Sequence, residues 1–271
     1  MHLVTDLFQY SFMVRAFLAG VIVAIIAPLI GSFLVVRRIS FIADALSHVA
    51  LTGVAIGLLI GVNPLITTIF CTIITAYIIE EIRSSEHISA ESILAMILPG
   101  GLALALILMS VANGFNANLF SYLFGSITTV TQQDVWIIVA LGVGIVSVLL
   151  LFYRQFTYTS FDEESARASG IPVRLVNQVF MALIALTVSL AMKVVGALLI
   201  GALMIIPVIT AMQIVKGFKV SIIFSVITAL ISVMGGLVFS YYANLPAGAT
   251  IVIVSILIFI ITSFVRKAGY R

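Results

Sequence analysis

The sequence has few charged residues, a single cysteine and no nucleotide-binding loop. Charged side chains make up 8% of its 271 residues, whereas a soluble domain carries roughly 25%, so a soluble globular fold is excluded. The one cysteine, Cys71, excludes an internal disulfide framework and a metal site built from several cysteines. The patterns G-x-x-x-x-G-K-[ST] and H-E-x-x-H are absent, which excludes a P-loop ATPase and a zinc protease of that type. These absences argue against an enzyme.

Long apolar runs fill most of the chain instead. Hydrophobic residues make up 63% of the sequence, and the mean hydropathy is +1.32. A helix needs about 20 apolar residues to cross a hydrocarbon core of about 30 Å. The sequence therefore predicts an all-α polytopic membrane protein, with one transmembrane domain over residues 1–271. Roughly eight or nine spans are expected, near 16–36, 41–60, 64–79, 92–112, 134–153, 176–192, 194–215, 220–241 and 248–265.

The distribution of basic residues predicts how these spans are oriented. If the N-terminus lies outside, all of the 13 lysines and arginines except Arg15 and Lys193 fall in or beside cytoplasmic segments. Short cytoplasmic loops carry an excess of Lys and Arg, so we expect an external N-terminus and a cytoplasmic C-terminus. The net charge of +3 needs no nucleic-acid partner, because these residues are explained as topology signals.

Two long connections between the spans carry elements of their own. The first, about 113–133, would be external, and its apolar segment Leu119–Gly125 is too short to span the membrane, so a re-entrant or interfacial helix is expected. The second, about 154–175, would be cytoplasmic. It contains a short predicted helix with Asp162 as N-cap and Gly170 at its end. This helix is either a solvated linker or a docking element, and its pattern leaves both open.

Two ionisable residues, Asp44 and His48, lie within the second predicted span. Such side chains are costly at membrane depth and mark a functional site by default. A spacing of four places them on one helical face. A carboxylate with an imidazole suits zinc and, with further oxygen ligands, manganese or iron. Two ligands do not complete a tetrahedral site, although a symmetric dimer would supply four. The structural alternative makes Asp44 a first-turn acid and His48 a hydrogen-bonding partner of a neighbouring helix.

Glycines recur at every fourth position in the same span. Gly53, Gly57 and Gly61 form a stripe beside the face that carries Asp44 and His48. Small residues at this spacing let another helix backbone approach closely. We therefore expect a neighbouring helix to pack against this stripe.

Several segments together resemble one family along nearly the whole chain. The segment Arg37–Ala55 carries the pattern D-x-x-x-H-x-x-x-x-G-V-A, which resembles the second-helix signature of the metal-ion ABC importer permeases for zinc and manganese. Further matching segments follow in the same order: Tyr122–Gly125, Phe161–Glu164 with Ala166 and Gly170, Gly196–Ile200 leading to Ile206 and Pro207, and Pro246–Ala249.

The resemblance implies a permease in a bacterial cell membrane, with a fold similar to that of the vitamin B12 importer permease. It also implies a homodimer that works with two copies of a separate ABC ATPase and with an extracellular metal-binding protein. Zn²⁺ or Mn²⁺ would be the transported cargo, and no permanently bound cofactor is expected. By the same resemblance, Asp44 and His48 line the metal path. The residues that correspond to the ATPase-docking coupling helix are Phe161, Asp162, Glu163, Ala166 and Gly170.

The resemblance favours zinc over manganese. Manganese-type members often carry proline at the position of Thr52, and the Phe-Asp-Glu-Glu form at Phe161–Glu164 resembles zinc-type members. The chain departs from some zinc-type relatives at Pro99–Gly101, where those relatives place a further histidine. A third ligand is therefore not carried over to this segment.

Two other classes of function remain open on the sequence. In a proton-coupled secondary metal transporter, Asp44 and His48 would relay protons, because intramembrane carboxylates and imidazoles also serve that purpose. In a non-transporting membrane scaffold, the same two residues would only hold helices together. The importer differs from both in requiring a separate ATPase.

Overall fold

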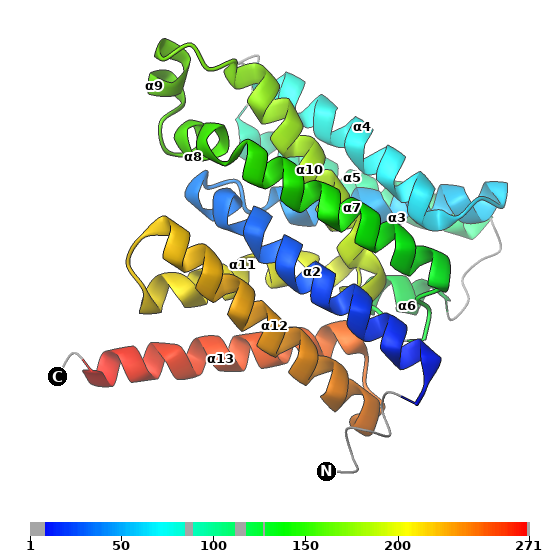
Figure 1. Ribbon diagram of the computed structural model, residues 1–271. Coiled ribbons are helices and arrows are strands. Elements are labelled where there is room, and N and C mark those ends of the chain that lie inside the picture. The colour runs from blue at the N-terminus through cyan, green and yellow to red at the C-terminus, as the bar shows by residue number, and fades with distance from the viewer. Residues whose placement is uncertain (1–8, 85–88, 112–117, 127, 270–271) are drawn as a thin grey trace.

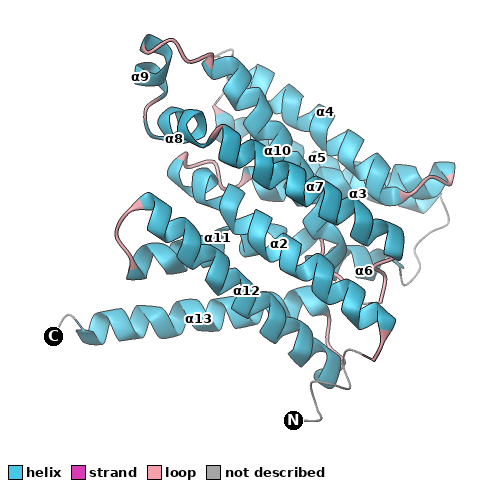
Figure 2. Ribbon diagram, viewed as in Figure 1, coloured by secondary structure: helices cyan, strands magenta, loops and turns pink. Residues whose placement is uncertain are grey.

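The computed structural model describes residues 9–84, 89–111, 118–126 and 128–269, and every regular element within them is helical (Figure 1; Figure 2). Nine helices in these ranges are long and apolar enough to cross a membrane, which confirms an all-α, multi-pass membrane protein. They are α2 (Ser11–Val36), α3 (Ile42–Ile60), α4 (Pro64–Ser84), α5 (Ala90–Val111), α7 (Gln132–Leu151), α10 (Val173–Val195), α11 (Ile200–Ile214), α12 (Phe218–Ala243) and α13 (Ala247–Gly269). The short elements are α6 (Asn118–Phe124), α8 (Tyr153–Phe161), α9 (Glu163–Ala168) and the 3₁₀ turn η1 (Ala197–Leu199).

The observed helices follow the predicted spans in order, and their ends differ by a few residues. Helix α2 begins earlier than predicted because Met13, which is 0% exposed, continues the buried face past Arg15. Helix α6 lies in the first long connection, where a helix was expected, and its re-entrant placement stays a prediction. Helix α8 was not predicted. It is held by Phe156, whose ring lies 5.7 Å from that of Phe180 on α10.

Helices α2, α3 and α10 form the centre of the bundle (Figure 1). The most apolar windows of α3 and α10 are each 72% buried, whereas those of α5 and α13 are 28% buried. Close backbone contact holds the centre together. A Cβ on Gly31 of α2 would lie 1.9 Å from the Met204 carbonyl oxygen of α11, so only glycine fits there. The outer faces of α5 and α13 are left for lipid or for another subunit.

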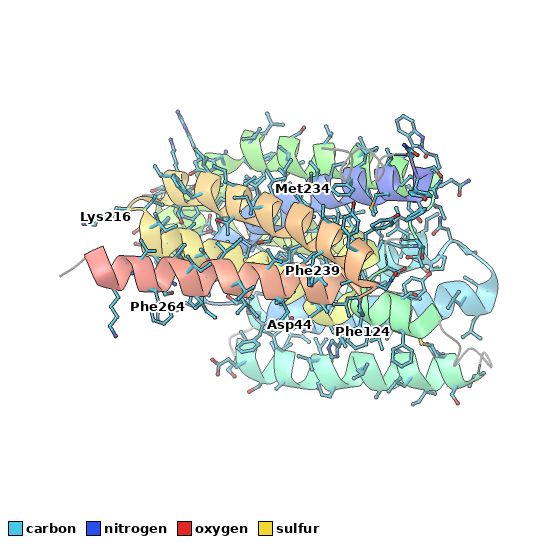
Figure 3. All side chains as sticks on the ribbon, turned by 90° about the horizontal axis from the view of Figure 1, so that it is seen from below. Asp44, Phe124, Lys216, Met234, Phe239 and Phe264 are labelled. Atoms are coloured by element: carbon cyan, nitrogen blue, oxygen red, sulfur yellow. The ribbon has the colours of Figure 1, made fainter. Side chains whose placement is uncertain are left out.

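Apolar side chains cover the outside of the long helices. Phe239 on α12 and Phe264 on α13, both labelled in Figure 3, are 56% and 70% exposed. Lipid contact accounts for such surfaces in a membrane protein, whereas a soluble monomer rarely exposes apolar patches of this extent. Lys216, in the connection between α11 and α12, lies at the same end of the bundle as Arg266 of α13, and both line one cavity.

A backbone break separates α10 from α11 and fixes where α11 begins. Gly196 adopts a φ of 88°, and a Cβ there would lie 2.3 Å from the backbone nitrogen of Gly125, which has a φ of 72°. Both positions therefore require glycine. A buried ion pair supports the junction: Lys193 Nζ on α10 lies 3.3 Å from Asp134 Oδ2 in the first turn of α7. The first turn of α11 then forms one wall of the candidate site.

Candidate metal site

Asp44 lies in the first turn of α3, and His48 follows one turn later. Both side chains are partly exposed, and Figure 3 labels Asp44 among the helices. The Asp44 carboxylate rests against Gly201 in the first turn of α11, where an added Cβ would lie 2.0 Å from Asp44 Oδ1. Gly201 therefore makes the room in which the carboxylate sits.

His48 lies against α5, which forms the second wall of the site. Its imidazole contacts the Leu98 backbone, and a Cβ on Gly101 would lie 3.1 Å from the His48 carbonyl carbon. Thr52 Oγ1 donates a hydrogen bond of 2.8 Å to the Gly101 carbonyl oxygen, which keeps α5 at this distance. The Nδ1 atom of His48 is buried and has no hydrogen-bond partner within the described residues. A neutral imidazole nitrogen in that position can accept a proton or bind a metal ion.

In the part of the chain that the structure describes, one copy supplies two candidate metal ligands at this site, Asp44 and His48. No group of three or more His, Cys, Asp and Glu side chains converges among those residues. In the segment Pro99–Gly101, where some relatives were expected to place a histidine, Gly101 instead lies against the backbone of His48 and Val49. The pair Asp44 and His48 can hold a divalent ion only with ligands from elsewhere, such as water or a second subunit.

The glycine stripe of α3 packs against α4 over two of its three positions. A Cβ on Gly53 would lie 2.5 Å from the Thr68 Cα, and one on Gly57 would lie 2.8 Å from the Pro64 Cα. Gly61 differs from the prediction. It has a φ of 70°, nothing within 4 Å of an added Cβ, and the C-cap position of α3. It ends the helix, because glycine adopts this left-handed conformation at little cost, and it makes no packing contact.

The second candidate surface is formed by α8 and α9. Asp162 caps α9 by accepting a hydrogen bond of 2.9 Å from the Ser165 backbone nitrogen, and hydrogen bonds from Ser165 hold the pKa of this carboxyl below its usual value. Phe161 is 61% exposed, and its ring packs edge-on against Phe218, 5.4 Å away. Gly170 ends the segment with a φ of 80°. Asp162 and Gly170 match the predicted helix start and stop, and the role of Phe161 as an apolar anchor stays a prediction.

Ala166 departs from its predicted place on this surface. It is 0% exposed, because α9 turns this side toward the rest of the chain. Ala166 therefore holds α9 in place and is not available to a docking partner in this conformation. The exposed side chains with charge or an aromatic ring in the segment are Phe161, Asp162, Glu164 and Arg167, with Glu163 partly exposed.

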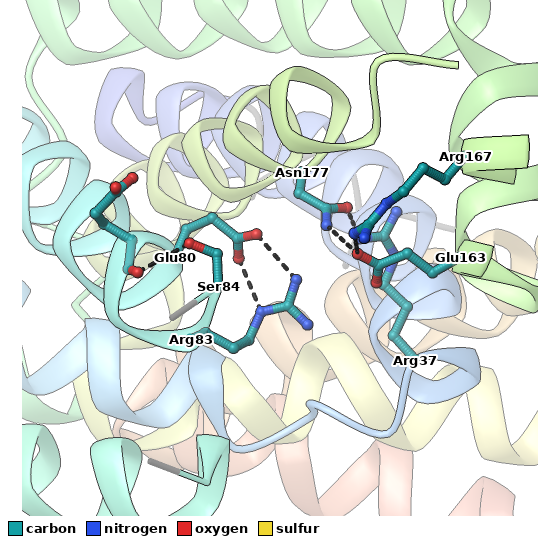
Figure 4. Close-up of polar contacts among 8 residues, drawn as sticks. Arg37, Glu80, Arg83, Ser84, Glu163, Arg167 and Asn177 are labelled. Atoms are coloured by element: carbon teal, nitrogen blue, oxygen red, sulfur yellow. Dashed lines mark hydrogen bonds and ion pairs between the residues drawn. The ribbon is translucent and has the colours of Figure 1, made fainter. Parts of the chain in front are cut away.

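A charged cavity of about 1040 Å³ lies between α4, α9 and the start of α10 (Figure 4). Glu80 on α4 receives two hydrogen bonds of 2.9 Å from Arg83. Across the cavity, Glu163 of α9 accepts a hydrogen bond of 3.3 Å from Asn177 Nδ2 of α10. Asn177 in turn accepts a hydrogen bond of 2.8 Å from Arg37 Nη1, in the connection between α2 and α3. The segment that carries α9 is thus linked to the connection that leads into the candidate metal site.

Sequence reasoning missed three features of this arrangement. Gly201 gives no local signal in the sequence that indicates contact with Asp44. Arg37 was assigned to topology, although its position directly before the Asp44 segment is a signal that could have been used. Lys193 was placed outside as an exception, whereas the structure pairs it with Asp134.

Comparison with known proteins identifies the family. The family model described as "ABC 3 transport family" matches residues 9–266 of this chain. The chain belongs to the ABC 3 transport family. As a member, it is a transport subunit of an ABC transporter rather than a catalytic one.

Individual members of the ABC 3 family match over nearly their whole length. The high-affinity zinc uptake system membrane protein ZnuB of Haemophilus influenzae is 32% identical, over 96% of this chain and 99% of its own. The manganese transport system membrane protein MntC of Listeria monocytogenes is 33% identical, over 97% of this chain and 94% of its own. A solved chain of PsaBC from Streptococcus pneumoniae, in complex with Fab, has a TM-score of 0.87 at 32% identity, covering 96% of this chain and 94% of that one.

Proposed function

We propose that this chain is the permease of an ATP-driven importer of a divalent transition metal. The observation that carries the proposal is the pair Asp44 and His48 on α3, with a buried, unpartnered Nδ1 on His48. Family membership supports it, because relatives over the full length are named as zinc or manganese transport proteins. The chain spans the membrane several times, with its N-terminus outside and its C-terminus in the cytoplasm, as the distribution of basic residues favours.

In this proposal the metal is held where two copies of the chain meet. One copy offers a single carboxylate and a single imidazole, and a symmetric homodimer would double both. The largely exposed faces of α5 and α13 leave room for a second copy. Asp44 and His48 would bind the ion transiently during transport, so the site needs only moderate affinity for the metal. No resident cofactor would take part.

Zinc is the first proposed cargo and manganese the second. A nitrogen and a carboxylate ligand suit the tetrahedral preference of zinc, and manganese accepts the same ligands when more oxygen atoms are added. Thr52, which we took from the resemblance as a zinc-type feature, donates its hydroxyl to Gly101 and so shapes the wall beside His48. Manganese is retained because MntC matches as well as ZnuB does.

Energy for transport would come from a separate ATPase that docks on α8 and α9. The chain has no P-loop of its own. Exposed Phe161 would be the apolar anchor, and Asp162 and Glu163 would form the polar rim, a division typical of protein interfaces. An extracellular metal-binding protein would deliver the ion to the opposite end. Closure of the two ATPase subunits would move α8 and α9 and rock the spans around the site.

Metal accumulation in cells tests the proposal. Total zinc and manganese are measured by elemental mass spectrometry in a deletion strain under metal limitation, complemented with the wild type, Asp44→Asn, His48→Ala or His48→Asn. The wild type is expected to restore one metal, and all three variants are expected to fail at equal protein level. Uptake that persists without ATP would favour the proton-coupled transporter. Normal uptake by His48→Asn would return His48 to a structural role.

A further inference from the structure

Arg37 stands at a rigid connection between two transmembrane helices. It follows the last residue of α2, and α3 begins five residues later at Ile42. Hydrogen bonds brace this short connection: the Ile39 nitrogen donates to the Leu34 carbonyl at 3.1 Å, and the Ile42 nitrogen donates to the Ile39 carbonyl at 3.1 Å. A displacement of Arg37 would therefore be carried into the first turn of α3, which holds Asp44.

The guanidinium of Arg37 reaches both the α8–α9 segment and α10. Its Nε donates to Ser160 Oγ on α8 at 2.7 Å, and its Nη1 donates to Asn177 Oδ1 on α10 at 2.8 Å. It lies over the ring of Phe180, 4.4 Å from the centroid. Through Asn177 it is linked to Glu163 of α9 (Figure 4). One side chain thus joins α8, α9 and α10 to the entrance of α3.

Stability alone does not account for this placement. Within the described residues Arg37 forms no ion pair, and its Nη2 is buried without a hydrogen-bond partner. A cation held by neutral groups, with one donor unused, is costly compared with an apolar side chain. Burial, with Arg83 nearby, lowers the pKa of Arg37 to about 10, which still leaves it charged at neutral pH. In some proteins a buried polar group of this kind sets a register or a switch.

Two carboxylates of the same cluster are the candidate acceptors for the unused Nη2. The carboxylates of Glu163 and Glu80 both act on the Arg37 charge. Glu80 is occupied by Arg83, whereas Glu163 is held only by Asn177 at 3.3 Å and by Arg167 at 3.8 Å. A shift of α9 would let Glu163 leave Asn177 and bind Nη2 directly. A coupling element requires two such arrangements.

We propose that Arg37 is the positioning residue that passes movement of α8 and α9 to α3 and so to Asp44. This proposal rests on the proposed function of α8 and α9 as the ATPase docking segment and of Asp44 as a metal ligand. Ser160 draws the guanidinium along when α8 moves, and the braced connection turns that displacement into a movement of α3. In this proposal Arg37 acts through Ser160, Asn177 and the connection to α3.

Coupling between ATP use and transport tests the proposal in the reconstituted permease–ATPase complex with its metal-binding protein. Arg37→Gln removes the charge and part of the donor fork. Arg38→Gln is the matched control, because Arg38 is an exposed arginine in the same connection. Three quantities are measured: ATPase association, basal ATP hydrolysis and ions transported per ATP. For Arg37→Gln we expect the first two to stay within about twofold and the third to fall about tenfold, a size typical of coupling between sites.

A second variant keeps the test informative if Arg37→Gln folds poorly. Ser160→Ala removes the acceptor of Nε and, within α8, the hydrogen bond that Ser160 Oγ donates to the Phe156 carbonyl at 2.6 Å. The ratio of ions to ATP is expected to fall about threefold, within the range by which mutations between two sites change their coupling. An unchanged ratio in either folded variant, or an equal fall in Arg38→Gln, overturns the proposal. A loss of ATPase association in step with transport also overturns it, since Arg37 would then be structural. If the wild-type complex moves no metal, the proposed function itself fails.

Discussion

Replacing Gly201 with alanine should displace the Asp44 carboxylate while leaving the fold intact. The added Cβ would lie 2.0 Å from Asp44 Oδ1 and 2.7 Å from its Cγ. Packed heavy atoms stay about 3 Å or more apart, so the carboxylate must move by about 1 Å. The helix backbone loses nothing from the change, because alanine is favoured over glycine by up to about 1 kcal/mol in a helix interior and by less in the first turn, where Gly201 lies.

A displacement of this size exceeds what a ligand site tolerates, which is about 0.5 Å. Changes beside metal ligands typically reduce affinity or activity about 10- to 100-fold, and we expect metal uptake by Gly201→Ala to fall by that factor. The assay is the initial rate of radioactive zinc or manganese uptake at equal amounts of protein in the membrane. Thermal stability of the purified variant, followed by size-exclusion chromatography after heating, should match the wild type.

Gly235→Ala in α12 serves as the control, because a Cβ added to Gly235 would have only Val254 Cγ1 nearby, at 3.7 Å. Its uptake rate should equal that of the wild type. If Gly201→Ala transports as well as Gly235→Ala does, the carboxylate position has no bearing on transport and the reasoning is refuted. If Gly201→Ala loses transport because the protein unfolds, the effect of the added Cβ is not confined to the Asp44 carboxylate, and this prediction is wrong.

Three other substitutions test the buried ion pair, the exposed ring of α8 and the cap of α9. Lys193→Met leaves the buried Asp134 carboxylate without its cationic partner, so it should lower the free energy of unfolding by about 3–5 kcal/mol. Chemical denaturation measures this loss, and a loss under 1 kcal/mol would contradict the pairing. Phe161→Ala should weaken ATPase association in pull-down without lowering thermal stability, and undiminished association would remove the docking assignment. The pKa of the Asp162 carboxyl is lowered in the folded protein, so its helix cap stabilises α9 at pH values above the ordinary pKa of 3.8. This stabilisation is lost as the pH falls through the folded pKa. In hydrogen exchange, the α9 amides of Asp162→Ala should be less protected than those of the wild type at neutral pH and equally protected in acid.

The membrane spans could be predicted from the sequence because each is an apolar run bounded by charge or turn residues. Helix α8 could not, because Tyr153–Phe161 has a mixed composition and its stability comes from Phe156 packing on rings from other helices. The cap and stop of α9 were predictable, since Asp162 and Gly170 act through their own backbone neighbours. The burial of Ala166 depends on how α9 folds back, which local pattern does not indicate.

The candidate site was predictable only along α3. The spacing of Asp44 and His48 places them on one face whatever surrounds them. Their walls come from α11 and α5, which are distant in sequence, so Gly201 and Gly101 gave no local signal. For the same reason, the ion pair between Lys193 and Asp134 could not be predicted: the two residues lie on different helices, and each looks like an isolated charge in the sequence.

Anomalous diffraction would locate the metal directly, in the purified permease–ATPase complex loaded with zinc or manganese and measured at the absorption edge of each metal. We expect a peak within ligand distance of Asp44 and His48, at about 2.0–2.2 Å for zinc, and no peak there in His48→Ala. A metal peak elsewhere in the membrane, with nothing between Asp44 and His48, would contradict it.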